Sequence, residues 1–213
     1  MAYDLQEQEQ LASIKAWWDK YGNFILTAVT AVLLAIAAYN GWGWYERREA
    51  SQAAVLYDEM KTALNGNNAA RVKELAGALV ERHPRTVYAA MAALHAARAH
   101  HDANDVAAAK AQLRWVIDRS GHEEFTLVAR VRLAGVLLDE KAFDEALGLV
   151  TGEVPDAHAT TFADRRGDIL LAQGKSAEAR AAWQQALVKA DAQHPLRNII
   201  QLKLDSLPAA AAS

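Results

Sequence analysis

The residues best suited to metal chemistry are the seven histidines, of which His95, His100 and His101 lie close together and are followed by Asp102. Ligands on one helix face are expected at positions i and i+4, as in the H-E-x-x-H motif. Here the spacings from His95 are five and six residues, and His100 and His101 fall where a helix is expected to end. The pattern therefore predicts no metal site, and no other pattern in the sequence indicates a cofactor.

Motifs for nucleophilic or nucleotide chemistry are absent from the sequence. It has no G-x-S-x-G, no Walker A loop, no dinucleotide glycine motif and no glycosidase-like arrangement of carboxylates. It has no cysteine, which excludes disulfides, thiolate metal sites and cysteine nucleophiles. The formal net charge is −3, and no basic patch indicates a nucleic-acid partner. We therefore predict that the protein is not an enzyme and acts through contacts with other proteins.

The segment from Tyr21 to Tyr45 contains no charged residue. As a helix it would rise about 37 Å, enough to cross the roughly 30 Å hydrocarbon core of a bilayer with some tilt. Aromatic residues of the kind that settle at membrane interfaces lie just before it and at its far end. They are Trp17, Trp18, Trp42, Trp44 and Tyr45. We predict one transmembrane helix over residues 21–45, preceded by an arm over residues 1–20.

Two other interpretations of this segment are weaker. A cleaved signal peptide has a short basic region before its apolar core, whereas here a polar, mostly acidic arm comes first. A buried helix of a soluble protein is usually shorter and lacks aromatic residues at both ends. The charges leave the orientation open, because Lys15, Lys20 and the α-amino group on one side are balanced by Arg47, Arg48 and Lys61 on the other.

Residues 46–207 have the pattern of repeated helical hairpins, with no sustained alternation of β-branched residues that would indicate strands. Turn-forming residues separate segments of about 10 to 18 residues, with turns expected at 65–68, 83–84, 102–104, 120–121, 151–155, 173–175 and 194–195. Alignment makes Val72, Ala109, Ala146 and Ala179 equivalent, at intervals of 37, 37 and 33 residues, close to the tetratricopeptide repeat (TPR) period of about 34. We predict an all-α fold: a TPR-like α-solenoid of about four hairpins, a C-terminal capping helix from Leu196 to Leu207, and a disordered tail at 208–213.

The hairpins are expected to pack through small residues, which let helices approach closely, and bulky ones, which fill the space beside them. The residues assigned to this packing are Leu133, Ala134, Phe143, Ala146, Gly167, Ala179, Trp183 and Ala186, with Gly174 in the turn of the last hairpin. Trp115 and Trp183 could instead anchor a peptide, but their repeat positions favour the core.

With these features the chain resembles the YfgM-type ancillary subunits of the bacterial SecYEG translocon over essentially its whole length. The resemblance is carried by EQEQLASIKAWWDKYGNFI near the start, GWGWY at 41–45, VRLAGVLLDEKAFDEAL at 131–147, ADRRGDILLAQGKSAEARAAWQQAL at 163–187, and IQLKLDSL at 200–207. Asp164, Arg166 and Arg180 lie outside the common repeat signature, which makes the match more specific than a repeat alone.

The resemblance implies a single-pass protein of the bacterial inner membrane, with its N-terminus in the cytoplasm and its TPR-like domain in the periplasm. It implies as partners the SecYEG translocon, a PpiD-type periplasmic chaperone and exported polypeptides. The implied function is scaffolding in protein transport. Two alternatives remain from the sequence: a membrane-tethered adaptor for another envelope assembly or enzyme complex, and a scaffold that self-associates.

Overall fold

The computed structural model describes residues 2–207, with side chains at residue 7 and from residue 9 onward. Every helix in this range is an α-helix, and no strand occurs among these residues. The all-α prediction is therefore confirmed. The tail at 208–213, predicted to be disordered, lies outside the described residues.

Helix α1 (Ala2–Asn65) runs without a break through the predicted arm, the predicted membrane span and the first repeat helix. Gly41 and Gly43 do not interrupt it. Within residues 2–207 it is the one helix long and apolar enough to cross a membrane, with a mean hydropathy of 1.9 in its apolar window. Contacts between residues divide the chain after Glu49 into two compact units.

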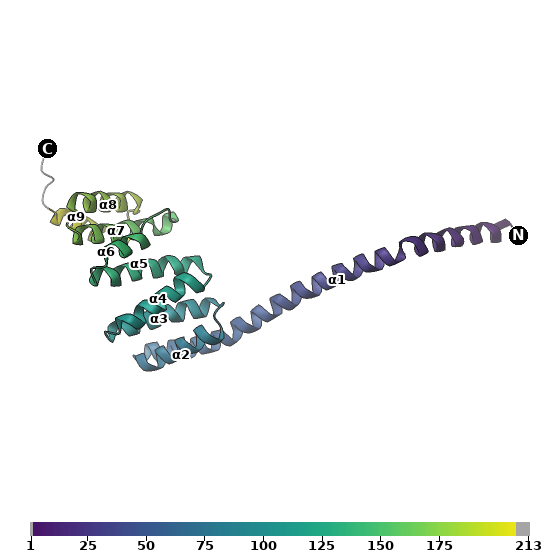
Figure 1. The fold of residues 1–213 in the computed structure, drawn as a ribbon, viewed down its shortest axis with the longest axis horizontal. Coiled ribbons are helices and arrows are strands. Elements are labelled where there is room, and N and C mark those ends of the chain that lie inside the picture. Colours follow the sequence, from purple (N-terminus) through teal and green to yellow (C-terminus); the bar gives the residue numbers. More distant parts are fainter. Residues whose placement is uncertain (1, 208–213) are drawn as a thin grey trace. The chain divides into compact units, whose positions relative to one another are not determined.

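The second unit, from Ala50 onward, consists of four helical hairpins and a capping helix that follow one another in chain order (Figure 1). The hairpins pair the end of α1 with α2 (Ala69–Arg82), α3 (Val87–Asp102) with α4 (Val106–Arg119), α5 (Glu123–Asp139) with α6 (Phe143–Leu149), and α7 (Asp156–Ala172) with α8 (Ser176–Lys189); α9 (Arg197–Ser206) is the cap. Helix α9 packs on α8 and closes that end of the stack. This is the short solenoid with a C-terminal cap that the sequence predicts.

All four hairpins close through the same three-residue turn. Its middle residue has a left-handed backbone and is Asn67 (φ 51°), Asn104 (φ 58°), Lys141 (φ 62°) or Gly174 (φ 79°). The next amide donates to the carbonyl five residues earlier, at 2.9 Å in Asn68 to Ala63, Asp105 to His100, Ala142 to Leu137 and Lys175 to Leu170. This bond caps the first helix in the manner of a Schellman motif. Glycine and asparagine suit the left-handed position, whereas a lysine adopts it at a cost.

The positions aligned from the sequence take the same place in every hairpin. Val72, Ala109, Ala146 and Ala179 are each the fourth residue of the second helix, and all four are buried. A small or compact residue at this point lets the second helix lie close to its neighbours.

The third hairpin differs from the expected lengths, because α6 has only 7 residues. Gly148 weakens the helix, and Gly152 just beyond it has a φ of 93°. Arg130 of α5 then donates to the carbonyls of Leu149 (2.7 Å) and Thr151 (3.1 Å). These bonds satisfy carbonyls that the early helix end leaves without partners.

Three hydrophobic clusters fill the stack, one around the first hairpin and α3, one in the middle, and one around the last hairpin and α9. Trp115 packs against the first two clusters, and Leu147 packs against the last two. The core is therefore continuous through the hairpins, as expected for repeats that stabilise their neighbours.

Candidate functional site

The aromatic residues predicted at the membrane interfaces form two exposed groups on α1, Trp17 with Trp18 and Trp42 with Trp44 and Tyr45. Along a helix, the two groups are roughly 36 Å apart, slightly more than the hydrocarbon thickness of about 30 Å. The indole of Trp42 donates to Glu46 (2.7 Å), so one edge of its ring is already paired with a polar group. Their interfacial role stays a prediction.

The residues assigned to repeat packing occupy three environments. Leu133, Ala134, Ala146, Gly167, Ala179, Trp183 and Ala186 are buried, Phe143 is half-buried, and Gly174 is exposed in its turn. Gly167 makes the closest approach, because a Cβ added there would lie 2.5 Å from Cδ1 and 2.8 Å from Cε2 of Trp183. The indole of Trp183 also donates to the carbonyl of Asp164 at 3.2 Å. These two helices therefore meet where only glycine leaves room for the indole.

The histidines do not converge. Nδ1 of His100 lies 3.0 Å from a carboxylate oxygen of Asp105, whereas His101 lies 3.8 Å from Asp102. Within residues 2–207 no group of three or more histidines, aspartates or glutamates is arranged to hold a metal ion. His95 and His101 both line the groove described next, whereas His100 does not.

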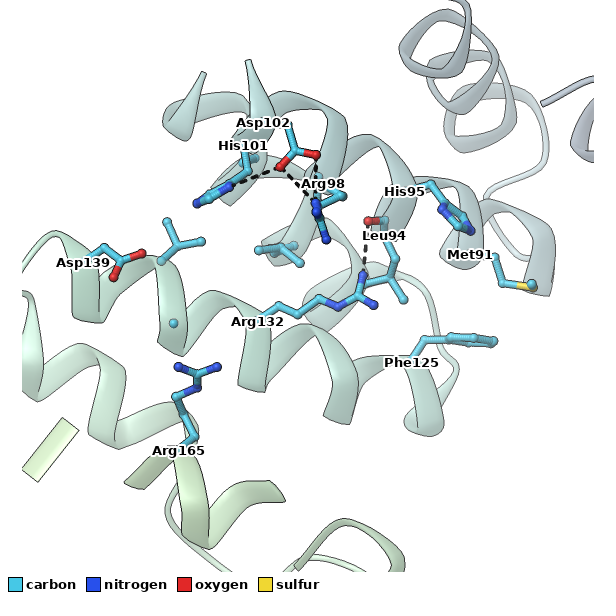
Figure 2. Close-up of a pocket in the computed structure, with 15 residues that line it drawn as sticks. Met91, Leu94, His95, Arg98, His101, Asp102, Phe125, Arg132, Asp139 and Arg165 are labelled. Atoms are coloured by element: carbon cyan, nitrogen blue, oxygen red, sulfur yellow. Dashed lines mark hydrogen bonds and ion pairs between the residues drawn. The ribbon is translucent and has the colours of Figure 1, made fainter. Parts of the chain in front are cut away.

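A groove of about 740 Å³ lies between α3 and α5 and extends to Arg165 of α7 (Figure 2). Met91, Leu94 and Phe125 contribute to its apolar lining. A second cavity, of about 310 Å³, shares three lining residues with the first and continues to the turn of the first hairpin. The groove alone touches three hairpins, and together with the second cavity it forms one surface that reaches all four.

Ionisable side chains reach this groove from equivalent positions in successive hairpins. His95, Arg132 and Arg165 each lie nine residues before the left-handed turn residue of their own hairpin. Asp102 and Asp139 each lie two residues before it. Stacking of the hairpins therefore brings to one groove side chains that are more than 30 residues apart in the chain.

The positive charges of the groove are only partly neutralised by the chain itself. Nε of Arg98 donates to both carboxylate oxygens of Asp102, at 2.9 and 2.8 Å. Arg132 donates to the carbonyl of Leu94 (3.3 Å) and has no carboxylate partner among the described residues. Burial, and after it the charge of Arg98, lower the pKa of Arg132. Burial and then the charge of Arg132 likewise lower the pKa of His95, which favours its neutral form.

Arg165 is also incompletely paired. Its closest carboxylate is that of Asp168, 3.7 Å from Nη1. Its Nε is buried and has no hydrogen-bond acceptor in the described part of the chain. Gly135 lies beside the guanidinium, and a Cβ there would be in van der Waals contact with Cζ of Arg165, at 3.4 Å. The groove thus presents guanidinium groups beside apolar side chains, an arrangement suited to binding a carboxylate.

The comparisons with known proteins agree with this architecture. The family model of the tetratricopeptide repeat-like domain matches residues 15–209. An ancillary SecYEG translocon subunit of Neisseria gonorrhoeae is 33% identical over 211 residues, covering 97% of this chain and 100% of that protein. The chain belongs to this family. Ancillary SecYEG translocon subunits of Escherichia coli and Haemophilus influenzae are 27% and 26% identical, over 94% and 87% of this chain and 96% and 91% of their own lengths.

The sequence correctly predicts that the chain belongs to the ancillary translocon subunit family. It also correctly predicts the TPR-like domain and an N-terminal helix long and apolar enough to cross a membrane. It does not predict the groove. The signal that could have found the groove is the common offset of His95, Arg132 and Arg165 from their turns. Reading that offset requires the turn around Lys141, which contains no glycine, asparagine or proline and was not recognised from the sequence.

Proposed function

We propose that this chain associates with the SecYEG translocon as a membrane-anchored scaffold. The similarity to the Neisseria gonorrhoeae subunit carries the proposal, because it spans 97% of this chain and so includes both the membrane helix and the hairpins. A similarity limited to the hairpins would have supported only a TPR-like fold, which serves many unrelated functions.

We further propose that the protein resides in the bacterial inner membrane, with its N-terminal arm in the cytoplasm and residues from about 46 in the periplasm. There the hairpins would link the translocon to a PpiD-type chaperone and assist exported polypeptides. The physical basis is proximity: tethering two partners at the same site raises their effective concentration, so weak contacts become occupied. The groove across three hairpins offers a surface for such contacts.

Scaffolding without catalysis is the role that the groove chemistry favours. Its polar lining consists of arginine, histidine and aspartate side chains, and Arg98 is already bound to Asp102. A nucleophile held by a general base, the arrangement expected for covalent catalysis, does not occur in this lining.

Photocrosslinking in intact cells tests the association. Phe125, which lines the groove, is replaced by p-benzoylphenylalanine, and Val188, which is 83% exposed on α8 outside it, is the control position. We expect adducts of the Phe125 variant with a translocon subunit, a PpiD-type chaperone or an exported chain, identified by mass spectrometry. Adducts restricted to cytosolic proteins would reverse the topology and refute the proposal.

The orientation has its own test, which the absence of cysteine makes simple. Ser51→Cys and Ser13→Cys place single thiols at exposed positions on either side of the predicted span. A membrane-impermeant maleimide, added to cells with a permeabilised outer membrane, should label Ser51→Cys and not Ser13→Cys. Labelling of the Ser13→Cys variant alone would invert the proposed topology.

A further inference from the structure

The groove between α3 and α5 is divided into a neutralised part and a cationic part. Arg98 and Asp102 pair with each other, so that pair offers little net charge to a partner. Arg132 binds only the Leu94 carbonyl, and Nε of Arg165 has no acceptor within residues 2–207. An incoming anion would therefore gain most beside Arg132 and Arg165.

Apolar side chains stand next to the cationic part. Figure 2 shows Asp139 at one end of the groove and Met91 with Phe125 at the other, with Arg132 reaching toward Leu94 between them. An anion near Asp139 would be repelled, whereas at Arg132 its neighbouring groups could rest on Leu94 and Phe125. The groove therefore suits a ligand that carries an acidic group directly beside an apolar one.

We propose that this groove binds an extended polypeptide segment of a partner protein in which an acidic side chain stands next to an apolar one, with Arg132 as the main partner of the carboxylate. A guanidinium binds a carboxylate through two parallel hydrogen bonds, which gives direction as well as charge. Burial on the apolar side strengthens this interaction relative to one in open solvent.

The length of the groove favours a polypeptide over a small anion. The cavity of about 740 Å³ continues into the one of about 310 Å³ through His95, Arg98 and Asp102, which line both. A phosphate ion would occupy only the space at the guanidinium groups and would leave the apolar lining uncovered. An extended segment covers both the cationic and the apolar part.

This inference rests on the proposed scaffolding function in naming a partner protein as the ligand, but its binding test does not use the translocon. The purified full chain in detergent micelles is titrated against a fluorescein-labelled peptide, Gly-Glu-Phe-Glu-Leu-Gly with a blocked C-terminus, and anisotropy is recorded. The control peptide has glutamine at both glutamate positions. We expect the glutamate peptide to bind at least about tenfold more tightly, as hydrogen bonds to charged groups allow.

Three variants locate the interaction. Arg132→Gln should abolish most of the preference for the glutamate peptide. Arg119→Gln removes the same charge from an exposed position at the end of α4 and should leave binding unchanged. Arg132→Lys keeps the charge but not the bidentate geometry, so it should bind with intermediate affinity. Far-UV circular dichroism of each variant verifies that the helices are retained, and Arg132→Lys carries the test if Arg132→Gln does not fold.

Equal binding of the two peptides, no binding of either, or equal weakening by Arg119→Gln and Arg132→Gln would each overturn the inference. Copurification of the same variants with tagged SecYEG is measured in parallel. Copurification without peptide binding would remove the inference and leave the proposed function intact. Peptide binding without copurification would remove the proposed function and leave the groove specificity standing.

Discussion

Gly167→Ala is the substitution for which helix propensity and tertiary packing predict opposite results. In a helix interior, replacing glycine by alanine usually stabilises by about 0.5–1 kcal/mol, because the unfolded chain loses freedom. Gly167 lies well inside α7, so propensity alone predicts a more stable protein.

Packing reverses this expectation. The new Cβ would lie 2.5 Å from Cδ1 of Trp183, whose side chain is only 1% exposed and has no free space to move into. Overpacking of this kind costs about 1–3 kcal/mol. Displacing the indole would also break its 3.2 Å hydrogen bond to the Asp164 carbonyl, which is worth about 1 kcal/mol. We expect a net destabilisation of about 1–3 kcal/mol after the propensity gain is included.

The assay is urea unfolding of the full chain in detergent micelles, followed by far-UV circular dichroism. Gly77→Ala is the matched control, because Gly77 lies in the interior of α2 and an added Cβ meets no atom within 4 Å. This control should be more stable than the parent by about 0.5–1 kcal/mol.

A double-mutant cycle identifies the cause. In a Trp183→Ala background, all the indole atoms that meet the new Cβ are removed, so Gly167→Ala should become neutral or stabilising. A Gly167→Ala protein as stable as the parent would refute the close approach of α7 and α8. A penalty that persists in the Trp183→Ala background would show that the strain arises somewhere other than at Trp183.

Four other changes have defined expectations. Lys141→Gly should stabilise by about 0.5–1 kcal/mol in urea unfolding, because it relieves a left-handed backbone at φ 62°; a loss of stability would contradict this. Ala179→Leu should destabilise by about 1–3 kcal/mol, since the site is fully buried, and an unchanged melting temperature would argue against the packing. In the folded state, burial and then the Arg132 charge lower the pKa of His95 below its ordinary 6.5. The unfolded chain therefore binds the proton more tightly, and the stability of the fold decreases as the pH falls below the ordinary pKa of 6.5. The melting temperature should therefore change less between about pH 7 and pH 5 in His95→Gln than in the parent protein. An equal change in both proteins would show that His95 does not cause this pH dependence. Deletion of residues 1–45 should give a helical protein that no longer sediments with membranes, whereas continued sedimentation would reveal a second attachment.

Much of the fold follows from patterns that depend on local chemistry. The uncharged segment from Tyr21 to Tyr45 predicts the membrane helix, and small residues at a near-constant interval, such as Ala146 and Ala179, predict the stacked hairpins. Three of the four hairpin turns could be found because their left-handed residue is asparagine or glycine. The fourth was missed because a lysine occupies that position, and only the surrounding helices impose its conformation.

The sequence does not predict the groove either, and the reason differs from that for the turn at Lys141. Arg98, Arg132 and Arg165 look like ordinary surface residues in the sequence, which does not show that they share a groove. Arg98 and Arg165 have acidic residues within four positions, whereas the acidic residue nearest to Arg132 is Asp139, seven positions away. Which of them is neutralised depends on rotamers and on the stacking of three hairpins: Arg98 binds Asp102, while Arg132 points toward the Leu94 carbonyl. Arg132 and Arg165 take equivalent positions in their hairpins and Arg98 does not, so the convergence of the three side chains on one groove is a tertiary property.

The shared turn has a consequence for how this chain can change over evolutionary time. A duplication or deletion that starts in one turn and ends at the equivalent residue of another joins two helices through a connection that the chain already uses. The stack can therefore gain or lose a whole hairpin in one recombination event, without a new loop having to be selected. The ends are less exchangeable, because α1 continues into the predicted membrane span and α9 is a single helix with no second helix after it within residues 2–207. Variation in length among related chains should therefore occur in whole hairpins between these two fixed ends.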